Sequence, residues 1–431
     1  MRVRKKLLPL LIFRRNWLRW GNRKKYIGRR YRMKVLMINC VCGIRSTGRI
    51  CTDLSEILES YGHECRIVYG RETIPEKYQH IALKLDSNIE IKINALKARI
   101  FDNEGFNAKK ETKKLIEYIG KYKPDIIHLH NLHGYYLNVE LLLGYLAERD
   151  IPVVYTMHDC WAITGHCAHF AKIKCEKWKT GCFNCAIKNE YPASFLMDSS
   201  KKNWEKKRAL FQKLNNIIIV TPSEWLANIL KQSYLKHQSI IVIPNGVDME
   251  VFQPTESDFR KKYKLENKHI VLGVATAWNE RKGLKEFMLL QKELDDSYQL
   301  VLVGLTQNQI QKLPDGVIGI ERTNSMQELA GLYSTADIFV NAGQEETMGL
   351  TTVEAMACGT PAVVSDLTAV PEVIDSDGGL IFTDYSVECM AEKIRSAVGM
   401  SFPYTRRSAM RYEKKRQYEK YLELYETMIT R

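Results

Sequence analysis

The chain has 431 residues, of which 45% are hydrophobic and 10% aromatic, so it holds enough apolar material for two cores and is not composed like a disordered protein. Its formal charge of +14 is concentrated at one end: residues 1–32 hold thirteen Lys and Arg and no Asp or Glu, which leaves 51 basic against 50 acidic residues in the rest. A body with almost no net charge gives no reason to expect a nucleic acid partner.

Residues 1–32 form a basic extension that we do not expect to be part of the fold. The apolar stretch 7–13 is far shorter than the ~20 residues that a membrane-spanning helix needs, and no small-residue cleavage site follows it. Two interpretations stay open: an amphipathic anchor for an anionic membrane surface, or translation from a start upstream of Met33. We therefore expect a cytoplasmic protein, peripheral on the cytoplasmic face of the membrane if the extension is an anchor.

From Met33 onward, short β-branched runs alternate with helical patterns, which predicts an α/β fold with two Rossmann-like, doubly wound parallel-sheet domains. The first predicted domain, residues 33–243, has strands at 35–38, 66–69, 126–129, 153–155 and 217–220, with helices such as 112–120 and 141–148 between them. The second, residues 268–405, has strands at 270–274, 300–304, 317–320, 338–340 and 362–364.

The segment 244–267, which opens with Pro244-Asn245-Gly246, is predicted to be the linker between the two domains. Open parallel sheets bind ligands beyond the carboxyl ends of their strands, so we expect an interdomain cleft to hold the site. Residues 406–431 are predicted to form a last helix that returns to the first domain. Its apolar residues recur at helical spacing on one face: Tyr418, Tyr421, Leu422, Tyr425 and Met428.

The densest motif is the string of residues 344–361, QEETMGLTTVEAMACGTP. It predicts a loop after a strand and then a helix from about Leu350. Free backbone N–H groups at a helix start beside Gly349 favour binding of a phosphate or diphosphate. Glu346 in the loop and Glu354 one turn into the helix bracket that position, and carboxylates suit sugar and ribose hydroxyl groups.

With this string the sequence resembles the retaining glycosyltransferases of family 4, which have the two-domain fold called GT-B. The resemblance runs from Met33 to the C-terminus and includes the 244–254 segment. It implies that Glu346 contacts the donor sugar, that Glu354 contacts the nucleotide ribose, and that the backbone of Thr347, Met348, Gly349 and Leu350 meets the diphosphate and the sugar.

Arg281 and Lys282 follow the first strand of the second domain, where two cations can neutralise a diphosphate leaving group. The resemblance implies an arginine and a lysine here, but the arginine ordinarily stands five residues before the lysine, and that position is Ala277. Arg281 is therefore expected to substitute for it.

The string Gly43-Ile44-Arg45-Ser46-Thr47-Gly48 follows the first predicted strand, and Arg49-Ile50 stands where a nucleotide-binding phosphate loop requires Lys-Ser or Lys-Thr. The resemblance implies a flexible glycine-containing loop that closes over the donor, with Gly48 in closest contact. A plain tight turn is the alternative.

Several histidines end strands of the first domain. His158 is, by resemblance, the residue of this domain that contacts the donor sugar, and Asp159 is expected to hold the tautomer of its ring. His128 and His130 share one face of another strand, with His133 just beyond. These three either line the acceptor pocket or pack structurally.

A cysteine-rich insertion, residues 160–192, carries Cys167, Cys175, Cys182 and Cys185. A structural zinc site and buried free thiols are both compatible with this irregular spacing. The insertion resembles that of a subgroup of family 4 enzymes that build bacterial surface polysaccharides, including colanic-acid-type transferases.

The sequence thus predicts a retaining hexosyltransferase that moves a sugar from a nucleoside diphosphate, with UDP expected ahead of GDP, to a saccharide or lipid-linked saccharide in surface polysaccharide synthesis. The expected catalytic residues are Glu346, His158, Lys282 and Arg281. Because these include side-chain cations that can meet the leaving diphosphate, neither a catalytic metal nor a cofactor is expected. The alternatives are a nucleotide-sugar epimerase of the same fold and a non-catalytic saccharide-binding protein.

Overall fold

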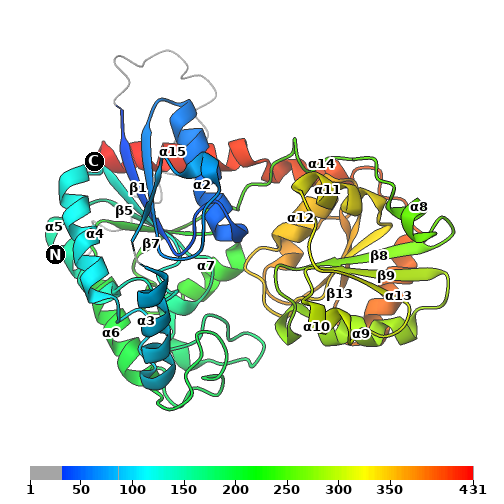
Figure 1. Cartoon of the computed structure of the whole chain (residues 1–431), viewed down its shortest axis with the longest axis horizontal. Helices are drawn as coiled ribbons and strands as arrows, with labels where there is room; N and C mark the ends of the chain where they lie inside the picture. The colour runs from blue at the N-terminus through cyan, green and yellow to red at the C-terminus, as the bar shows by residue number, and fades with distance from the viewer. Residues whose placement is uncertain (1–31, 86, 431) are drawn as a thin grey trace, which may run out of the picture. The chain divides into compact units, whose positions relative to one another are not determined.

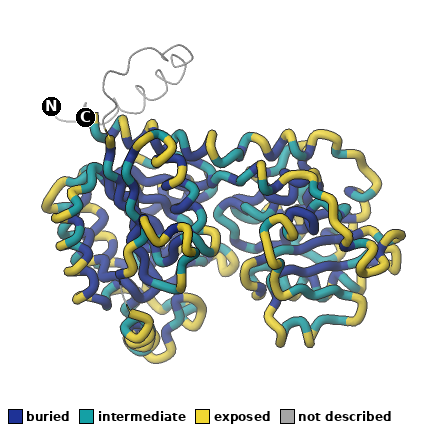
Figure 2. Tube along the Cα trace, turned by 45° about the horizontal axis from the view of Figure 1, so that its top comes forward, coloured by how far each residue is buried: buried dark blue, intermediate teal, exposed yellow. Residues whose placement is uncertain are grey.

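The strands of the protein form two parallel sheets, which confirms the predicted fold class (Figure 1). The computed structural model describes residues 32–85 and 87–430, so the predictions for residues 1–32 fall almost entirely outside the described part. One compact unit begins at Lys34 and contains both sheets. In Figure 2 the interior of each half is dark blue, because the central strands of each sheet are buried between helices, whereas strands at the edges are partly exposed.

The first sheet has seven strands in the order β3-β2-β1-β4-β5-β6-β7. Its central strand β1 pairs with β2 on one side and β4 on the other, so that Val35 lies between Cys65 and Ile126. The strands are β1 (Lys34–Asn39), β2 (Glu64–Tyr69), β3 (Ala82–Lys84), β4 (Ile126–Leu129), β5 (Val153–Thr156), β6 (Ile217–Thr221) and β7 (Ser239–Val242).

The second sheet has six strands in the order β10-β9-β8-β11-β12-β13. The strand order reverses between β8 and β11, so the loops that follow these two strands diverge and leave room for a ligand, as is usual in open α/β sheets. The strands are β8 (His269–Val274), β9 (Tyr298–Val303), β10 (Val317–Ile320), β11 (Ile338–Asn341), β12 (Ala362–Ser365) and β13 (Gly379–Phe382).

Helices cover the faces of both sheets, as parallel sheets require. Those of the first half are α2 (Arg45–Ser60), α3 (Asn88–Phe101), α4 (Lys109–Tyr122), α5 (Val139–Arg149), α6 (Ser200–Lys213) and α7 (Glu224–Leu230). Those of the second half are α8 (Phe259–Tyr263), α9 (Leu284–Glu293), α10 (Gln307–Ile310), α11 (Met326–Thr335), α12 (Leu350–Ala357), α13 (Val387–Val398), α14 (Thr405–Ala409) and α15 (Lys414–Ile429).

Three strands were not predicted from the sequence, namely β3, β7 and β13, and each is the last strand at an edge of its sheet. An edge strand is paired on one side only and is therefore shorter and less uniformly apolar than a central one. β3 has three residues and exposes Leu83.

The segment 244–267, predicted as a linker, contributes Phe252, Phe259 and Leu265 to the core of the second half. The helix α15 follows that half in the sequence but lies along α2, as Figure 1 shows in red beside blue. All five apolar residues that the sequence places on its inner face are buried. None of the helices in the described ranges is long and apolar enough to cross a bilayer.

Candidate functional site

Two loops of the second half meet at the point where its strand order reverses. The loop after β8 ends in a short 3₁₀ helix, η5 (Glu280–Lys282), and the loop after β11 leads into α12. Gly283 has a φ of +79°, and a Cβ atom there would lie 2.6 Å from the carbonyl oxygen of Ala342, so only glycine lets the two loops pack this closely. The N–H of Gln344 also donates to the carbonyl of Arg281 at 2.8 Å.

This packing brings Lys282 and Glu346 together, as the sequence predicts for a donor site. The Lys282 Nζ forms an ion pair with the Glu346 Oε1, and the Arg281 guanidinium donates to the carbonyl of Glu345 at 2.7 Å. Burial alone would raise the pKa of Glu346, but the charges of Lys282 and Arg281 outweigh it and lower that pKa. Glu346 is therefore an ionised carboxylate beside two cations.

The start of α12 has the features expected of an anion site. Gly349, in the left-handed region with a φ of +88°, is the residue before the helix, and no side chain caps the helix there. The carboxylate of Glu354 lies one turn into the helix, where it accepts from the hydroxyl of Tyr333 at 3.0 Å and lies 3.9 Å from Arg49. Burial raises the pKa of Glu354 more than Arg49 and Tyr333 lower it.

Several groups of the first half contact these loops directly. The hydroxyl of Thr347 donates to the carbonyl of His158 at 3.1 Å. The buried carboxylate of Glu345 accepts from the N–H groups of Phe170 at 3.0 Å and Ala171 at 2.6 Å, both in the cysteine-rich insertion. The predicted residues Arg281, Lys282, Glu346, Thr347 and His158 are thus brought together.

The prediction that Asp159 holds the ring of His158 is wrong. His158 Nε2 instead lies 3.0 Å from Nδ1 of His130, and Asp159 is bound to His133 at 2.7 Å. Burial lowers the pKa of His158 to about 4, so its ring is neutral at physiological pH. The ring of His130 is buried, and its Nε2 has no partner among the described residues.

The structure gives the three remaining histidines, His128, His130 and His133, different surroundings. His128 is fully buried, with its ring nitrogens 2.6 Å from the Tyr425 hydroxyl and 2.8 Å from the Thr156 hydroxyl, so it packs structurally. His133 is also engaged on both sides, by Asp159 and by the hydroxyl of Tyr191 at 2.9 Å. Of the three, only His130 keeps a ring nitrogen without a partner.

The structure also corrects the prediction of a flexible, glycine-containing loop around Gly48. Residues 45–60 are helical, so Gly48 lies in the first turn of α2 and not in a flexible loop. Its carbonyl accepts from the N–H of Gly43, and a Cβ atom at Gly48 would meet Val41, Cys42 and Gly43. A side chain at position 48 would thus be crowded by the protein's own turn at 41–43.

The eleven cysteines are free thiols. Within the ranges 32–85 and 87–430, no three His, Cys, Asp or Glu residues are grouped as they would be to hold a metal ion. Cys167 is buried, and its hydrogen bond to Cys185 lowers the pKa of Cys185 to about 7 against the effect of burial.

Sequence reasoning missed two residues that contact the site, Glu345 and Arg49. Glu345 stands within the string that carries the prediction, but nothing local shows that its partners lie 174 and 175 residues away. Arg49 was considered only as a mismatch to a phosphate loop, although it lies between Glu354 and the sulfur of Met326, 3.4 Å away.

Comparison with known proteins agrees with this arrangement. A family model described as Glycosyltransferase Family 4 matches residues 47–251, and one described as Glycosyl transferases group 1 matches residues 255–417. WcaC of Escherichia coli (strain K12), a glycosyl transferase assigned to colanic acid biosynthesis, is 22% identical over 92% of this chain and 100% of its own. The O-antigen chain mannosyltransferase RfbU of Salmonella typhimurium is 30% identical over 36% of this chain and 44% of its own.

Solved structures share the fold. Sucrose-phosphate synthase from Thermosynechococcus elongatus has a TM-score of 0.69 at 16% identity, covering 93% of this chain and 100% of that one. Anabaena Alr3699/HepE in complex with UDP has a TM-score of 0.63 at 14% identity, covering 92% and 100%. The two family models together span nearly all of the chain from residue 47, and the chain belongs to the family 4 glycosyltransferases of the GT-B fold.

Proposed function

We propose that this nucleotide-sugar glycosyltransferase transfers a hexosyl residue from a UDP-sugar to a lipid-linked saccharide during synthesis of a bacterial surface polysaccharide. The observation that carries the proposal is the convergence of Lys282, Arg281 and the start of α12 on one position next to Glu346. A structure of Anabaena HepE with UDP-glucose, which has the same fold, supports UDP as the nucleotide. WcaC and RfbU support the polysaccharide product.

The chemistry of transfer follows from these charges. As the bond between the sugar and the diphosphate breaks, negative charge grows on the leaving group, and Lys282, Arg281 and the N-terminus of α12 would stabilise it. Positive charge grows on the sugar ring, and the ionised Glu346 would lie beside it. Asp159, the carboxylate nearest to His158 in sequence, is held by His133 and by the N–H of Trp161, so it is not placed as a covalent nucleophile.

Without a covalent nucleophile, retention of configuration at the anomeric carbon requires the acceptor hydroxyl to attack from the same face that the nucleotide leaves. We propose that the acceptor hydroxyl gives its proton to the departing phosphate, which makes a divalent metal and a second carboxylate unnecessary. The neutral ring of His158 would contact the sugar from the first half of the chain, and His130 would orient that ring.

The test is ligand-observed NMR of the full chain with UDP-, GDP-, ADP- and dTDP-sugars in the presence of a chelator. We expect one UDP-sugar to bind, and Glu354→Ala to abolish the binding because the ribose loses its acceptor. Glu266→Ala, which removes an exposed carboxylate, is the control and should bind as the unchanged protein does.

Two results would contradict the proposal. Unchanged binding by Glu354→Ala would show that the glutamate string does not form the donor site. Conversion of the nucleotide sugar without an acceptor would identify an epimerase, because a transferase alone releases free nucleotide only by slow hydrolysis.

A further inference from the structure

Helix α3 carries large apolar side chains on the face that points away from the protein. Ile89, Ile93 and Leu96 are exposed, Ile89 and Leu96 by 70% and 57%, and their spacing of four and three residues puts them on one stripe. The buried positions of the same helix are Asn94 and Ala98, which are smaller. This is the reverse of an ordinary surface helix, whose large apolar residues face the core.

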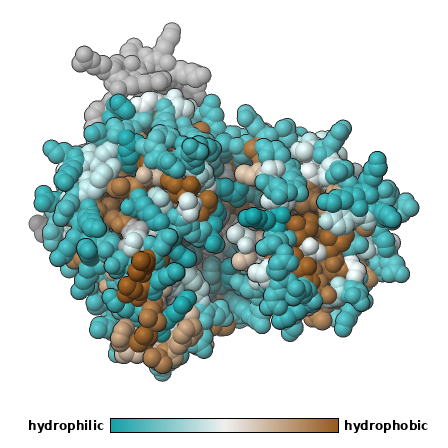
Figure 3. Space-filling model, viewed as in Figure 1, coloured by the Kyte–Doolittle hydropathy of each residue, from teal (hydrophilic) through white to brown (hydrophobic). Residues whose placement is uncertain are grey.

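A neighbouring loop extends this apolar surface. Phe101 at the end of α3 is exposed, and so are Phe195, Leu196 and Met197. The N–H groups of Phe195 and Met197 donate to the carbonyls of Arg99 and Ile100, so the loop runs against the last turn of α3. We call these residues, with Ile89, Ile93 and Leu96, the α3 surface; Figure 3 shows brown side chains gathered at the lower left, where Figure 1 places α3.

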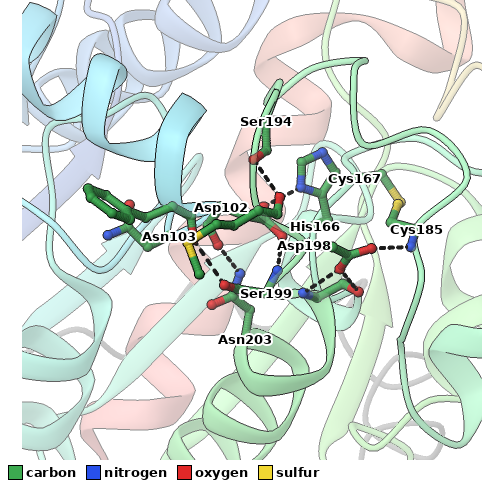
Figure 4. A network of polar contacts seen from close by, with 12 residues as sticks. Asp102, Asn103, His166, Cys167, Cys185, Ser194, Asp198, Ser199 and Asn203 are labelled. Atoms are coloured by element: carbon green, nitrogen blue, oxygen red, sulfur yellow. Dashed lines mark hydrogen bonds and ion pairs between the residues drawn. The ribbon is translucent and has the colours of Figure 1, made fainter.

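Hydrogen bonds at both ends hold this loop with its apolar side chains outward. Asp102, the residue after α3, binds His166 and accepts from the N–H of Ser199 at 2.7 Å, and Asp198 accepts from the N–H of Cys185 at 2.6 Å (Figure 4). Ser194 closes the other end, because its hydroxyl donates to the carbonyl of Met197 at 2.8 Å. The exposure of residues 195–197 is therefore built into the fold.

Cations flank the apolar stripe on both sides. Lys92 and Arg99 lie on one side of it, and Lys97 lies on the other side, which Glu90 shares, since successive residues turn by about 100° around a helix. An adjoining surface hollow, lined in part by Phe101 and Met197, adds Lys109 and Lys202, together with a Lys206 that is paired with Glu140 at 3.1 Å. An apolar stripe between rows of Lys and Arg is the pattern of a helix that lies in the interface of an anionic bilayer.

We propose that the α3 surface docks the protein onto an anionic membrane, with the apolar side chains entering the headgroup region and the cations meeting lipid phosphates. Charge also argues against residues 1–32 as the occupant, because that segment is itself strongly basic and would be repelled. Docking through the α3 surface would follow from the geometry of α3 alone and does not depend on the transfer reaction, although it would suit an enzyme with a lipid-linked acceptor.

The experiment is hydrogen exchange on the full chain, with and without vesicles of phosphatidylglycerol and phosphatidylcholine in equal parts. We expect slower exchange in peptides covering 88–101 and 194–199 with these vesicles, and little change with phosphatidylcholine alone. Because peptides are resolved, binding through residues 1–32 gives a different pattern. Protection confined to residues 1–32 would overturn the proposal, and so would protection of 88–101 that needs no vesicles and rises with protein concentration, since that marks a second copy.

Two triple variants test whether the apolar side chains of the α3 surface are what binds the vesicles. The triple change Ile89→Ser, Ile93→Ser and Leu96→Ser should weaken partitioning onto the anionic vesicles by at least about tenfold, because it removes most of the inserted apolar area. The matched control changes three exposed apolar residues of the second half, Leu289→Ser, Met400→Ser and Met410→Ser, and should partition as the unchanged protein does. Equal partitioning by both triple variants, with folding checked by circular dichroism, would exclude the α3 surface.

Discussion

At the scale of single residues, the pairing of Lys282 with Glu346 decides how the site is charged. Lys282 forms an ion pair with Glu346 and lowers the pKa of Glu346 against the effect of burial. Lys282 is at the same time the cation proposed to stabilise the leaving diphosphate. One substitution should therefore change two measurable properties.

We predict that Lys282→Met lowers kcat by about 100-fold or more, which is typical when a group that stabilises transition-state charge is removed. Burial then acts on Glu346 with less opposing charge, so its pKa rises. Since the carboxylate is ionised above its pKa, the acid side of the profile of kcat/KM against pH should move to higher pH. Lys285→Met, a change on the first turn of α9, is the control for the loss of a lysine. A profile that keeps its acid limb unchanged would mean that Glu346 is not the titrating group.

The local structure of the candidate site was predicted correctly where it depends on neighbours in the chain: a loop follows a strand, and a helix begins at Leu350. The string 344–361 contains both glutamates and the helix start, so its arrangement follows from neighbours in the chain. The partners of His158 and Asp159 were assigned wrongly because both depend on strands β4 and β5 lying side by side, which places His130 and His133 next to them. Adjacent residues at a strand end point to different sides and do not hold each other.

At the scale of elements, α15 is held to the first sheet by buried hydroxyl groups. Tyr425 is hydrogen-bonded to His128, and Tyr421 to Thr156, at 2.6 and 2.9 Å. Burial and the neighbouring His158 hold the pKa of His128 well below its usual value, so its ring is neutral, with one donor and one acceptor nitrogen. Both ring nitrogens are hydrogen-bonded, and one of their two partners, Tyr425, belongs to α15.

We predict that Tyr425→Phe lowers the free energy of unfolding by about 1–3 kcal/mol, because one nitrogen of His128 is left buried without a partner. Tyr404→Phe, at a position exposed to solvent, should change it by less than about 0.5 kcal/mol. Urea unfolding followed by circular dichroism measures both. Equal stability of the two variants would show that α15 is held by its apolar contacts alone; deletion of residues 418–431 should then still destabilise the protein.

The edge strands and helix α3, whose apolar face points outward, are elements that the sequence pattern does not predict correctly. Periodicity in the sequence shows which residues lie on the same face of a helix or strand. It does not show which face packs against the rest of the protein. In α3 the large residues and the small residues both lie on stripes, and only the structure shows that the small ones face inward.

At the scale of the whole molecule, two carboxylates of the second half, Glu345 and Glu372, each accept from a pair of backbone N–H groups of the first half. Glu345 accepts from the N–H groups of Phe170 and Ala171, and Glu372 accepts from those of Glu224 at 2.8 Å and Trp225 at 2.6 Å, at the start of α7. The two contacts are chemically alike, but only Glu345 stands in the loop that carries Glu346. Substitutions of Glu345 and Glu372 can therefore be compared to test whether the loop that carries Glu346 is energetically coupled to the cysteine-rich insertion.

We predict that a bound UDP-sugar slows hydrogen exchange at Phe170 and Ala171, because ordering of the loop 342–349 fixes the carboxylate that accepts from their N–H groups. Glu345→Gln should abolish this protection and weaken nucleotide binding by about tenfold, since a charge-assisted contact worth roughly 1.5–3 kcal/mol is reduced. By reciprocity, a contact that the donor strengthens must also strengthen donor binding. Glu372→Gln should speed exchange at residues 224 and 225 but leave nucleotide affinity unchanged. If both variants weaken binding equally, the effect belongs to general contact between the halves; if neither does, the insertion and the donor loop act independently.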